Sequence, residues 1–193
     1  MAVLNAASPP RSPWLARWAV VAGLLLAGAA RGHAQAGPSE YQIKAVFLFN
    51  FAQFVEWPAA AFDGPQAPLV IGVLGQDPFG PHLDATVRGE VIDGRPLVVR
   101  KFGRVEEVEP CHILFISRSE SRHLEPIVAA LRGRPILTVG DTEGYALRGV
   151  MIRFVAEKGR IRLRINLDAA KAAGLVVSSK LLRPAEIVTT KEN

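Results

Sequence analysis

The stretch that organises this chain is Tyr41-Gln-Ile-Lys-Ala-Val-Phe-Leu-Phe-Asn-Phe-Ala-Gln-Phe-Val-Glu-Trp-Pro58, which holds four of the nine phenylalanines. At about 100° per residue, its large apolar residues fall on one stripe of a helix. That stripe consists of Ile43, Phe47, Phe51, Phe54 and Val55, with Leu48 at its edge. Ser39 can cap the first turn, and Pro58 opposes continuation beyond Trp57. The pattern therefore predicts an amphipathic helix with an aromatic face.

Phe49 departs from that stripe. In the helical projection it shares the polar side with Gln42, Gln53 and Glu56. Two interpretations follow from this position. Either another layer of the fold covers the ring, or Phe49 contacts a partner protein or a second copy of the chain.

The first 36 residues differ in character from the rest. Arg11 and Arg17 precede an apolar run over residues 18–30, and Ala34-Gln35-Ala36 has the small-x-small pattern of a cleavage site. This combination predicts a secretory signal peptide over residues 1–36. An uncleaved anchor is the alternative, although the run is short for a membrane span. No cysteine lies near the cut, which excludes a lipoprotein anchor.

Cleavage after Ala36 would leave 157 residues, enough for a single domain over residues 37–193 with its own core. Three of the 23 basic residues would leave with the signal peptide, so 20 basic residues would face 18 acidic ones. This near balance does not favour nucleic acid as a partner. Cys111 is the only cysteine and opens an apolar run, so we expect a buried, unreactive thiol and no internal disulfide.

Apolar segments of strand length alternate with short helical segments after residue 68. We expect strands at residues 69–74, 95–100, 112–116 and 135–139, and helices at residues 81–87 and about 122–132. Residues 150–156 and 160–166 flank Glu157-Lys158-Gly159, which predicts a hairpin, and helices follow at residues 168–173 and 178–183. The order predicts an α/β fold: a mixed, mostly parallel sheet with helices on both faces and a C-terminal antiparallel hairpin.

Polar turns follow three of these strands. Their side chains, together with the residue that ends the hairpin, are Gln76, Asp77, Ser117, Arg118, Ser119, Asp141 and Asn166. In open α/β sheets ligands bind beyond the carboxyl ends of the strands. If the three strands are parallel neighbours, the turns share a rim that could bind a small ligand. Ordinary turn and helix-cap chemistry is the alternative.

A stripe of arginines follows the predicted hairpin. Arg160, Arg162 and Arg164 alternate with aliphatic residues, which places them on one face of the strand, and Arg153 lies on the partner strand. Such a stripe could bind a phosphate, a carboxylate or an acidic partner surface. It could equally be a solvated face that prevents edge-to-edge pairing.

Signatures of catalysis are missing from the sequence. There is no Gly-x-Ser-x-Gly motif and no phosphate-binding glycine loop. His82, His112 and His123 lack metal-ligand spacing, and His112 begins a strand, which favours a structural role. Ser178-Ser179-Lys180 has the atoms of a Ser–Lys dyad but is more typical of a helix cap. We therefore predict no catalytic residues, no metal, no cofactor and no enzymatic activity.

Five segments carry a resemblance to a known family. They span residues 44–58, 71–80, 111–117, 137–141 and 165–182, and include Phe54-Val-Glu-Trp-Pro58, Leu137-Thr-Val-Gly-Asp141 and Ile165-Asn-Leu-Asp-Ala-Ala-Lys171. In these segments the chain resembles the YfiR family, also called domain of unknown function 4154. The resemblance covers nearly all of the chain after the predicted signal peptide.

The resemblance implies a periplasmic α/β protein without enzymatic activity. It implies repression of an inner-membrane diguanylate cyclase by binding to its periplasmic part, within the cyclic-di-GMP signalling that governs biofilms. It also implies sequestration by an outer-membrane lipoprotein related to OmpA. Members studied as redox-sensitive carry cysteine pairs, whereas Cys111 has no partner, so we expect no disulfide control here. The alternative function is a periplasmic small-molecule sensor or solute-binding module that uses the strand-end rim.

Overall fold

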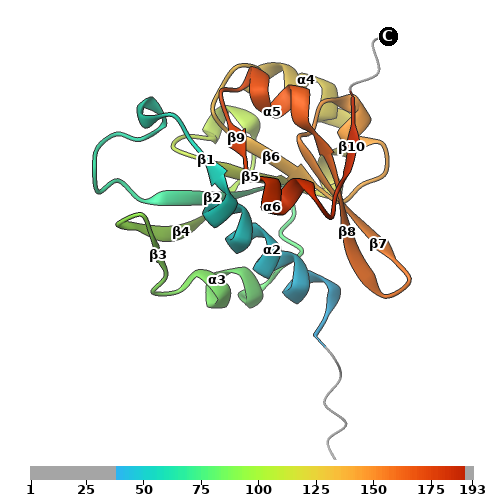
Figure 1. Ribbon diagram of the computed structural model, residues 1–193, viewed down its shortest axis with the longest axis horizontal. Coiled ribbons are helices and arrows are strands. Elements are labelled where there is room, and N and C mark those ends of the chain that lie inside the picture. Colours follow the sequence, from blue (N-terminus) through green and yellow to red (C-terminus); the bar gives the residue numbers. More distant parts are fainter. Residues whose placement is uncertain (1–37, 190–193) are drawn as a thin grey trace, which may run out of the picture. The chain divides into compact units, whose positions relative to one another are not determined.

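The computed structural model describes residues 38–189, which Figure 1 shows in colour. The predicted signal peptide at residues 1–36 lies outside the described residues, as do residues 37 and 190–193. In the part of the chain that is described, no helix combines the length and the apolar character needed to cross a membrane.

An eight-stranded sheet forms the centre of the fold, in the order β10-β8-β7-β6-β5-β2-β4-β3 (Figure 1). The strands are β2 (Leu69–Leu74), β3 (Val91–Ile92), β4 (Arg95–Phe102), β5 (Ile113–Ile116), β6 (Leu137–Gly140), β7 (Ile152–Glu157), β8 (Arg160–Asn166) and β10 (Glu186–Val188). Only β3–β4 and β7–β8 pair antiparallel; every other neighbouring pair is parallel. The predicted mixed sheet with a C-terminal hairpin is confirmed.

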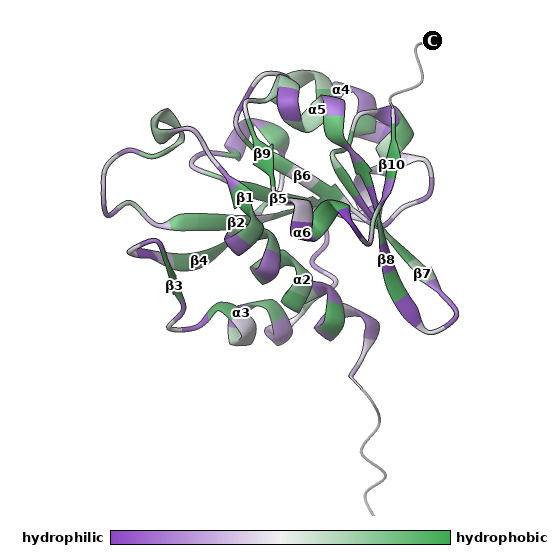
Figure 2. Ribbon diagram, in the orientation of Figure 1, coloured by the Kyte–Doolittle hydropathy of each residue, from purple (hydrophilic) through white to green (hydrophobic). Residues whose placement is uncertain are grey.

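Helices cover both faces of the sheet, because the buried strands are apolar on both sides (Figure 2). Along β5, Ile113 and Phe115 face one core, and Leu114 and Ile116 face the other. The first core is covered by α2 (Glu40–Phe54), α3 (Pro81–Val87), α5 (Leu167–Ala172) and α6 (Ser179–Leu182). The second is covered by α4 (Leu124–Leu131) and the 3-10 helix η4 (Tyr145–Arg148).

The organising helix α2 begins as predicted. Ser39 forms a capping box in which its hydroxyl accepts the N–H of Gln42 at 3.3 Å. The helix ends at Phe54, earlier than the predicted Trp57, because Val55 and Glu56 form strand β1 (Val55–Glu56). This strand pairs antiparallel with β9 (Val176–Val177), and backbone pairing there replaces the last helical turn.

The buried face of α2 is rotated from the predicted stripe. Its fully buried residues are Lys44, Ala45, Leu48, Phe51 and Ala52, whereas Ile43, Phe47 and Phe54 are half-buried. Ala45 and Ala52 lie on this buried face beside Phe51, whereas the rings of Phe47 and Phe54 pack along its flanks. Phe47 and Phe51 both contact the ring of Phe154 on β7, with ring centroids 5.8 and 5.7 Å away.

The end of the chain contains a strand that the sequence pattern does not predict. The last element predicted was the helix at residues 178–183, but β10 follows it and pairs in parallel with Arg164, Ile165 and Asn166 of β8. Its central residue Ile187 is 50% exposed, so β10 depends on backbone hydrogen bonds more than on burial. Such a strand leaves little apolar periodicity in the sequence.

The β7–β8 hairpin extends past the rest of the sheet (Figure 1). β7 pairs with β6 only through Ile152 and Arg153, and β8 pairs with β10 only from Arg164 onward. Residues 154–163 therefore form a two-stranded ribbon. Figure 2 shows hydrophilic residues gathered at its tip.

Candidate functional site

The three predicted strand-end turns do share one rim. Strands β2, β5 and β6 are parallel neighbours, so Gln76, Ser117 and Asp141 follow their strands at the same edge of the sheet. This arrangement matches the edge at which open α/β sheets bind ligands. The rim has two parts that differ in how fully their polar groups are satisfied.

The part beyond β2 and β5 is closed by its own hydrogen bonds. The Ser117 hydroxyl donates to the Gln76 carbonyl at 2.5 Å, and the Gln76 N–H donates to the Ser119 hydroxyl at 3.0 Å. Gly75 permits this approach: it has φ +84°, and a Cβ there would lie 2.3 Å from the Ser119 oxygen. These polar groups are occupied by one another, which favours the turn-and-cap interpretation for them.

Asp77 is occupied in the same way. Its carboxylate accepts the N–H of Phe79 at 2.8 Å, in the turn that leads into α3. The other oxygen forms an ion pair with Lys101 at 2.8 Å. Asp77 therefore fixes the turn after β2.

The part of the rim beyond β6 is built around a buried lysine. Lys44 is 2% exposed, and its ammonium lies 2.5 Å from Asp141 and 2.5 Å from Glu40. Asp141 also accepts the Tyr41 hydroxyl at 3.0 Å. A buried charge requires partners of this kind. Lys44 thereby fastens the first turns of α2 to the carboxyl end of β6.

The environment of this cluster shifts the pKa of Tyr41. Burial is the main cause that raises the pKa of its phenol to about 12, and the charge of Asp141 and the hydrogen bond to it add to the shift. The hydroxyl therefore stays protonated and remains a donor throughout the physiological range.

A cavity of about 440 Å³ opens beside this cluster. It lies between the start of α2, the rim turns of β5 and β6, and the first residues of β7. Its polar lining consists of Glu40, Tyr41, Lys44, Arg118, Asp141, Thr142, Glu143 and Arg153. Of the predicted rim residues the structure thus places Arg118 and Asp141 on one cavity, and it adds Arg153 from the hairpin.

Asn166 lies elsewhere. It is fully buried, its amide donates to the Ala146 carbonyl at 3.1 Å, and its oxygen accepts the Ala169 N–H at the start of α5. Because β8 runs antiparallel to β7, its last residue returns to the beginning of β7 and not to the open rim. The structure supports a structural role for Asn166.

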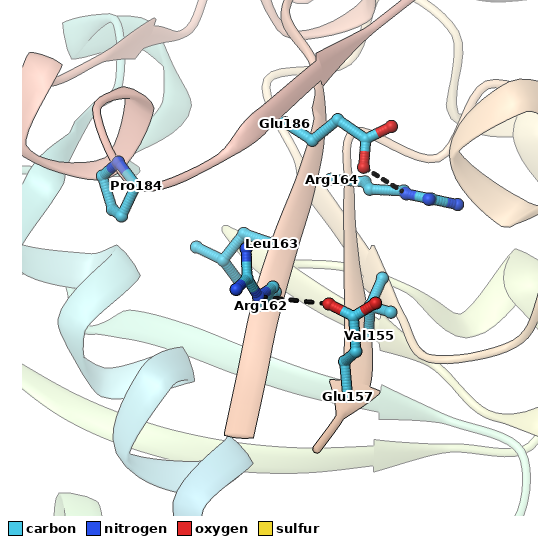
Figure 3. A pocket seen from close by; sticks show the side chains of 7 residues that line it. All are labelled: Val155, Glu157, Arg162, Leu163, Arg164, Pro184 and Glu186. Atoms are coloured by element: carbon cyan, nitrogen blue, oxygen red, sulfur yellow. Dashed lines mark hydrogen bonds and ion pairs between the residues drawn. The ribbon is translucent and has the colours of Figure 1, made fainter. Parts of the chain in front are cut away.

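The predicted arginine stripe lies on one face of the hairpin, with carboxylates between its members. Figure 3 shows Arg162 directed toward Glu157 and Arg164 directed toward Glu186. The two ion pairs measure 3.2 and 2.8 Å. The cavity between them is about 100 Å³, which is small for a metabolite. Arg162 and Arg164 are thus part of a mixed-charge surface.

Arg153 differs from the other arginines of the stripe. It lies directly opposite Arg164 across the hairpin, and Arg164 is already paired with Glu186. The Nε of Arg153 is buried and has no hydrogen-bond partner in the described residues. Like charges opposite one another destabilise a strand pair, so Arg153 is the member of the stripe most in need of a counter-charge.

Phe49 is half-buried and packs against the first core. The apolar side chain that α2 leaves most exposed is instead Val46, at 48%. The structure therefore gives Phe49 a packing role of its own, and a partner contact would use only the exposed part of its ring.

Lys44 and Tyr41 are site residues that the sequence analysis missed. A signal was present, because Lys44 lies at helical spacing with Leu48, Phe51 and Val55, on the most buried face of α2. A lysine on such a face predicts a buried carboxylate partner. The partner's identity depends on tertiary structure, since Asp141 is 97 residues away.

His112, expected to be structural, is buried at the opposite edge of the sheet. Its Nδ1 accepts the Val70 N–H at 3.0 Å, so its Nε2 carries the proton and donates to the Ala61 carbonyl at 3.1 Å. Burial lowers the pKa of this imidazole. The Trp57 indole donates to the His112 carbonyl at 3.1 Å, and the Phe62 ring stacks on the imidazole at 4.4 Å.

The other reactive residue types are also part of the framework. Cys111 is buried as predicted, and burial raises the pKa of its thiol to about 12. Ser178 caps α6 through the Lys180 N–H, while the Lys180 ammonium lies 5.3 Å from the Phe54 ring centre. In residues 38–189 no three His, Cys, Asp or Glu side chains are grouped so that they could hold a metal ion.

A known family matches most of the described chain. Residues 41–186, from Tyr41 of α2 to the start of β10, match the YfiR/HmsC-like family of domain of unknown function 4154. The chain belongs to the YfiR/HmsC-like family. This YfiR-like protein therefore comes from a periplasmic family of regulators in cyclic-di-GMP signalling, not from a family of enzymes. A search of curated proteins found no match.

Proposed function

We propose that this YfiR-like protein is a non-enzymatic periplasmic repressor of an inner-membrane diguanylate cyclase, and that it acts by binding the periplasmic part of the cyclase. The observation that carries the proposal is the family match over residues 41–186. The partner chemistry is supported by the projecting hairpin, on which Arg160 and Arg162 are exposed. Exposed charges of this kind mainly accelerate association with an acidic surface.

Two further partners belong to the same proposal. An outer-membrane lipoprotein related to OmpA would compete for the protein and relieve repression. A second copy of the chain is the alternative occupant of the α2 surface near Phe49. Export is part of the proposal too: N-terminal sequencing of the periplasmic protein should start at Gly37, and an intact Met1 would contradict cleavage after Ala36.

The central experiment co-produces the full chain with a membrane-bound diguanylate cyclase of the source organism and measures cyclic-di-GMP. Repression should require export, so a form that lacks residues 1–36 is the matched control and should leave the cyclic-di-GMP level high. A full chain that reaches the periplasm and binds no periplasmic cyclase region would contradict the proposal.

The hairpin is tested by binding kinetics over a salt series. Arg162→Ala and Arg164→Ala should slow association with the cyclase region at low salt and flatten the salt dependence. Arg104→Ala is the control, because Arg104 is also an exposed, ion-paired arginine but lies after β4, away from the hairpin. Curves that superimpose on the wild type for both hairpin variants would leave the stripe with only a solvating role.

The contact at Phe49 is tested by two readouts on Phe49→Ala. A packing role predicts a lower melting temperature and normal affinity of the folded protein. A partner role predicts weaker cyclase binding or dimerisation beyond what the change in stability explains. Val46→Ala, on the exposed side of α2, is the control.

A further inference from the structure

The cavity beside α2 combines three segments that are distant in the sequence. The start of α2 contributes Tyr41 and Lys44, the rim turns contribute Arg118 and Thr142, and the start of β7 contributes Arg153. Its volume of about 440 Å³ falls within the range of roughly 300–1,000 Å³ typical of small-molecule sites. It also lies at the carboxyl edge of the parallel strands, where this fold class binds ligands.

The carboxylates in the cavity wall either have partners already or are exposed to water. Asp141 and Glu40 both contact the Lys44 ammonium, and Asp141 also holds the Tyr41 hydroxyl. Glu143 is exposed, so water screens its charge. Neither Arg118 nor Arg153 forms an ion pair with any residue between 38 and 189. The cavity thus carries two guanidinium groups without a carboxylate of their own.

Arg153 shows most directly that positive charge in the cavity wall lacks a counter-charge. Its Nε is buried without a hydrogen-bond acceptor in the described part of the chain. The residue opposite Arg153 is another arginine, whose own carboxylate partner is Glu186. A buried donor of this kind is normally satisfied in a native structure, and an anion bound to the guanidinium would supply the counter-charge that Arg153 lacks.

We propose that this cavity binds a small anion with a carboxylate or phosphate group, held by the guanidinium groups of Arg153 and Arg118, which both line it. The planar guanidinium offers paired N–H donors that fit the oxygens of either group. The proposal does not depend on the cyclase partner, and it joins a rim residue to a hairpin residue that the sequence analysis had assigned to separate surfaces.

A bound anion would connect the base of the hairpin to the rim turns. The cavity residues of β7 are Arg153 at the base of the projecting ribbon and residues 154–156 within it, so occupancy would stabilise the folded state around the surface proposed for the cyclase. The protein would therefore respond to the presence of a small anion in the periplasm.

The test is isothermal titration calorimetry together with thermal unfolding, on protein purified after expression of the full chain. The probes are inorganic phosphate, citrate, succinate and acetate, with sodium chloride at matched ionic strength as the blank. Saturable binding and a higher melting temperature with phosphate alone would identify a phosphate site. The same result with the carboxylates alone would identify a carboxylate site.

Three variants locate the binding. Arg153→Gln and Arg118→Gln should each weaken binding by about tenfold or more, as expected for loss of a charge-assisted hydrogen bond. Arg160→Gln is the matched control, because it removes an exposed charge from the same hairpin outside the cavity. Arg118 is itself exposed, so its variant should fold normally even if Arg153→Gln does not.

The outcomes separate cleanly. Loss of binding in both cavity variants with retention in Arg160→Gln supports the site. The proposal is overturned if no probe gives saturable binding, or if Arg160→Gln weakens binding as much as Arg118→Gln does. Either of these results would leave the cyclase proposal untouched, since that proposal is read from cyclic-di-GMP levels.

Discussion

The amino and carboxyl ends of the parallel strands, called here the amino edge and the carboxyl edge, hold two buried polar clusters. The clusters differ in whether all of their donors and acceptors are satisfied. At the amino edge, both ring nitrogens of His112 have partners and its carbonyl is occupied by Trp57. At the carboxyl edge, Lys44 and Asp141 are satisfied, but Arg153 beside them has a buried Nε without a partner in the described residues. One cluster fills its space, whereas the other borders a cavity.

The difference shows which edge can do more than support the fold. A fully satisfied buried cluster fixes one structure and has no donor left for a ligand. An incompletely satisfied cluster next to a cavity has donors to offer. Cys111 and His112, of the residue types that first attract a search for function, lie at the closed, amino edge here. The open edge uses lysine, arginine and tyrosine.

The largest expected effect is at Lys44. Lys44→Met removes the cation from a buried cluster and leaves Asp141 without its main partner, which should lower the free energy of unfolding by about 3–5 kcal/mol. Urea unfolding at neutral pH measures this. Lys101→Met is the control, since it breaks an exposed ion pair to Asp77 at the closed part of the rim and should change stability little.

A double variant sharpens the interpretation of Lys44. If Lys44→Met lowers the free energy of unfolding because the Asp141 carboxylate is left without a cation, combining it with Asp141→Asn should recover part of the stability. A Lys44→Met protein as stable as the wild type would mean that water or Tyr41 compensates Asp141, and that the open edge is less dependent on its ion pair than we infer.

The second effect concerns the closed edge. His112→Phe keeps a ring for Phe62 to stack on, but leaves the Val70 N–H and the Ala61 carbonyl without their partner. We expect a loss of about 2 kcal/mol in unfolding free energy at neutral pH. His123→Phe is the control, because His123 is exposed.

His112 should also make the wild type sensitive to acid. Burial lowers its pKa in the folded state from the ordinary value of 6.5, so below that value the unfolded chain binds a proton that the folded chain excludes. Its stabilisation is therefore complete above pH 6.5 and declines as the pH falls. The stability difference between the wild type and His112→Phe should shrink on acidification. A constant difference would show that His112 is not held neutral.

Much of the fold was predictable because its strands are strongly apolar. The runs at β2 and β5 and the turn of the β7–β8 hairpin have local signatures, and the predicted mixed sheet was confirmed. Strands β1, β3, β9 and β10 were missed because two or three residues carry no period. Three of them, β1, β9 and β10, exist through pairing with distant segments, such as Val55 with Val177.

The candidate site was predictable only in part. A shared rim could be predicted because the strands before the turns were expected to be parallel neighbours. The sequence could not show that Gln76, Ser117 and Ser119 satisfy one another's hydrogen-bonding groups. Nor could it show that Arg153 lines the same cavity as Asp141, since strand alternation gives a face and not its neighbours. Whether the donors and acceptors of a polar cluster all find partners depends on tertiary contacts.

A smaller effect is expected at Cys111, which adjoins His112 at the closed edge. Cys111→Ala should cost about 1 kcal/mol of unfolding free energy, because it removes one buried sulfur next to Gly72. Cyclase repression should be unchanged with and without oxidant, since the thiol is buried and its pKa is raised to about 12. An oxidant effect on the wild type that Cys111→Ala abolishes would contradict this.

The smallest effect is at Tyr41, at the open edge. Tyr41→Phe removes the hydroxyl from Asp141 but leaves Lys44 in place, so the loss should be about 0.5 kcal/mol, the lower end for a hydrogen bond that is only partly buried. The sharper readout is ultraviolet titration of the two tyrosines, assigned by comparison with the variant. The raised pKa of Tyr41, about 12 against an ordinary 10.0, means that its contribution to stability is complete below pH 10 and is lost as the pH rises toward 12. A phenol that titrates at its ordinary pKa would show that the Asp141 cluster is open to water. In that case the contrast between the two edges would be one of solvent access, and Arg153 would have water as its acceptor.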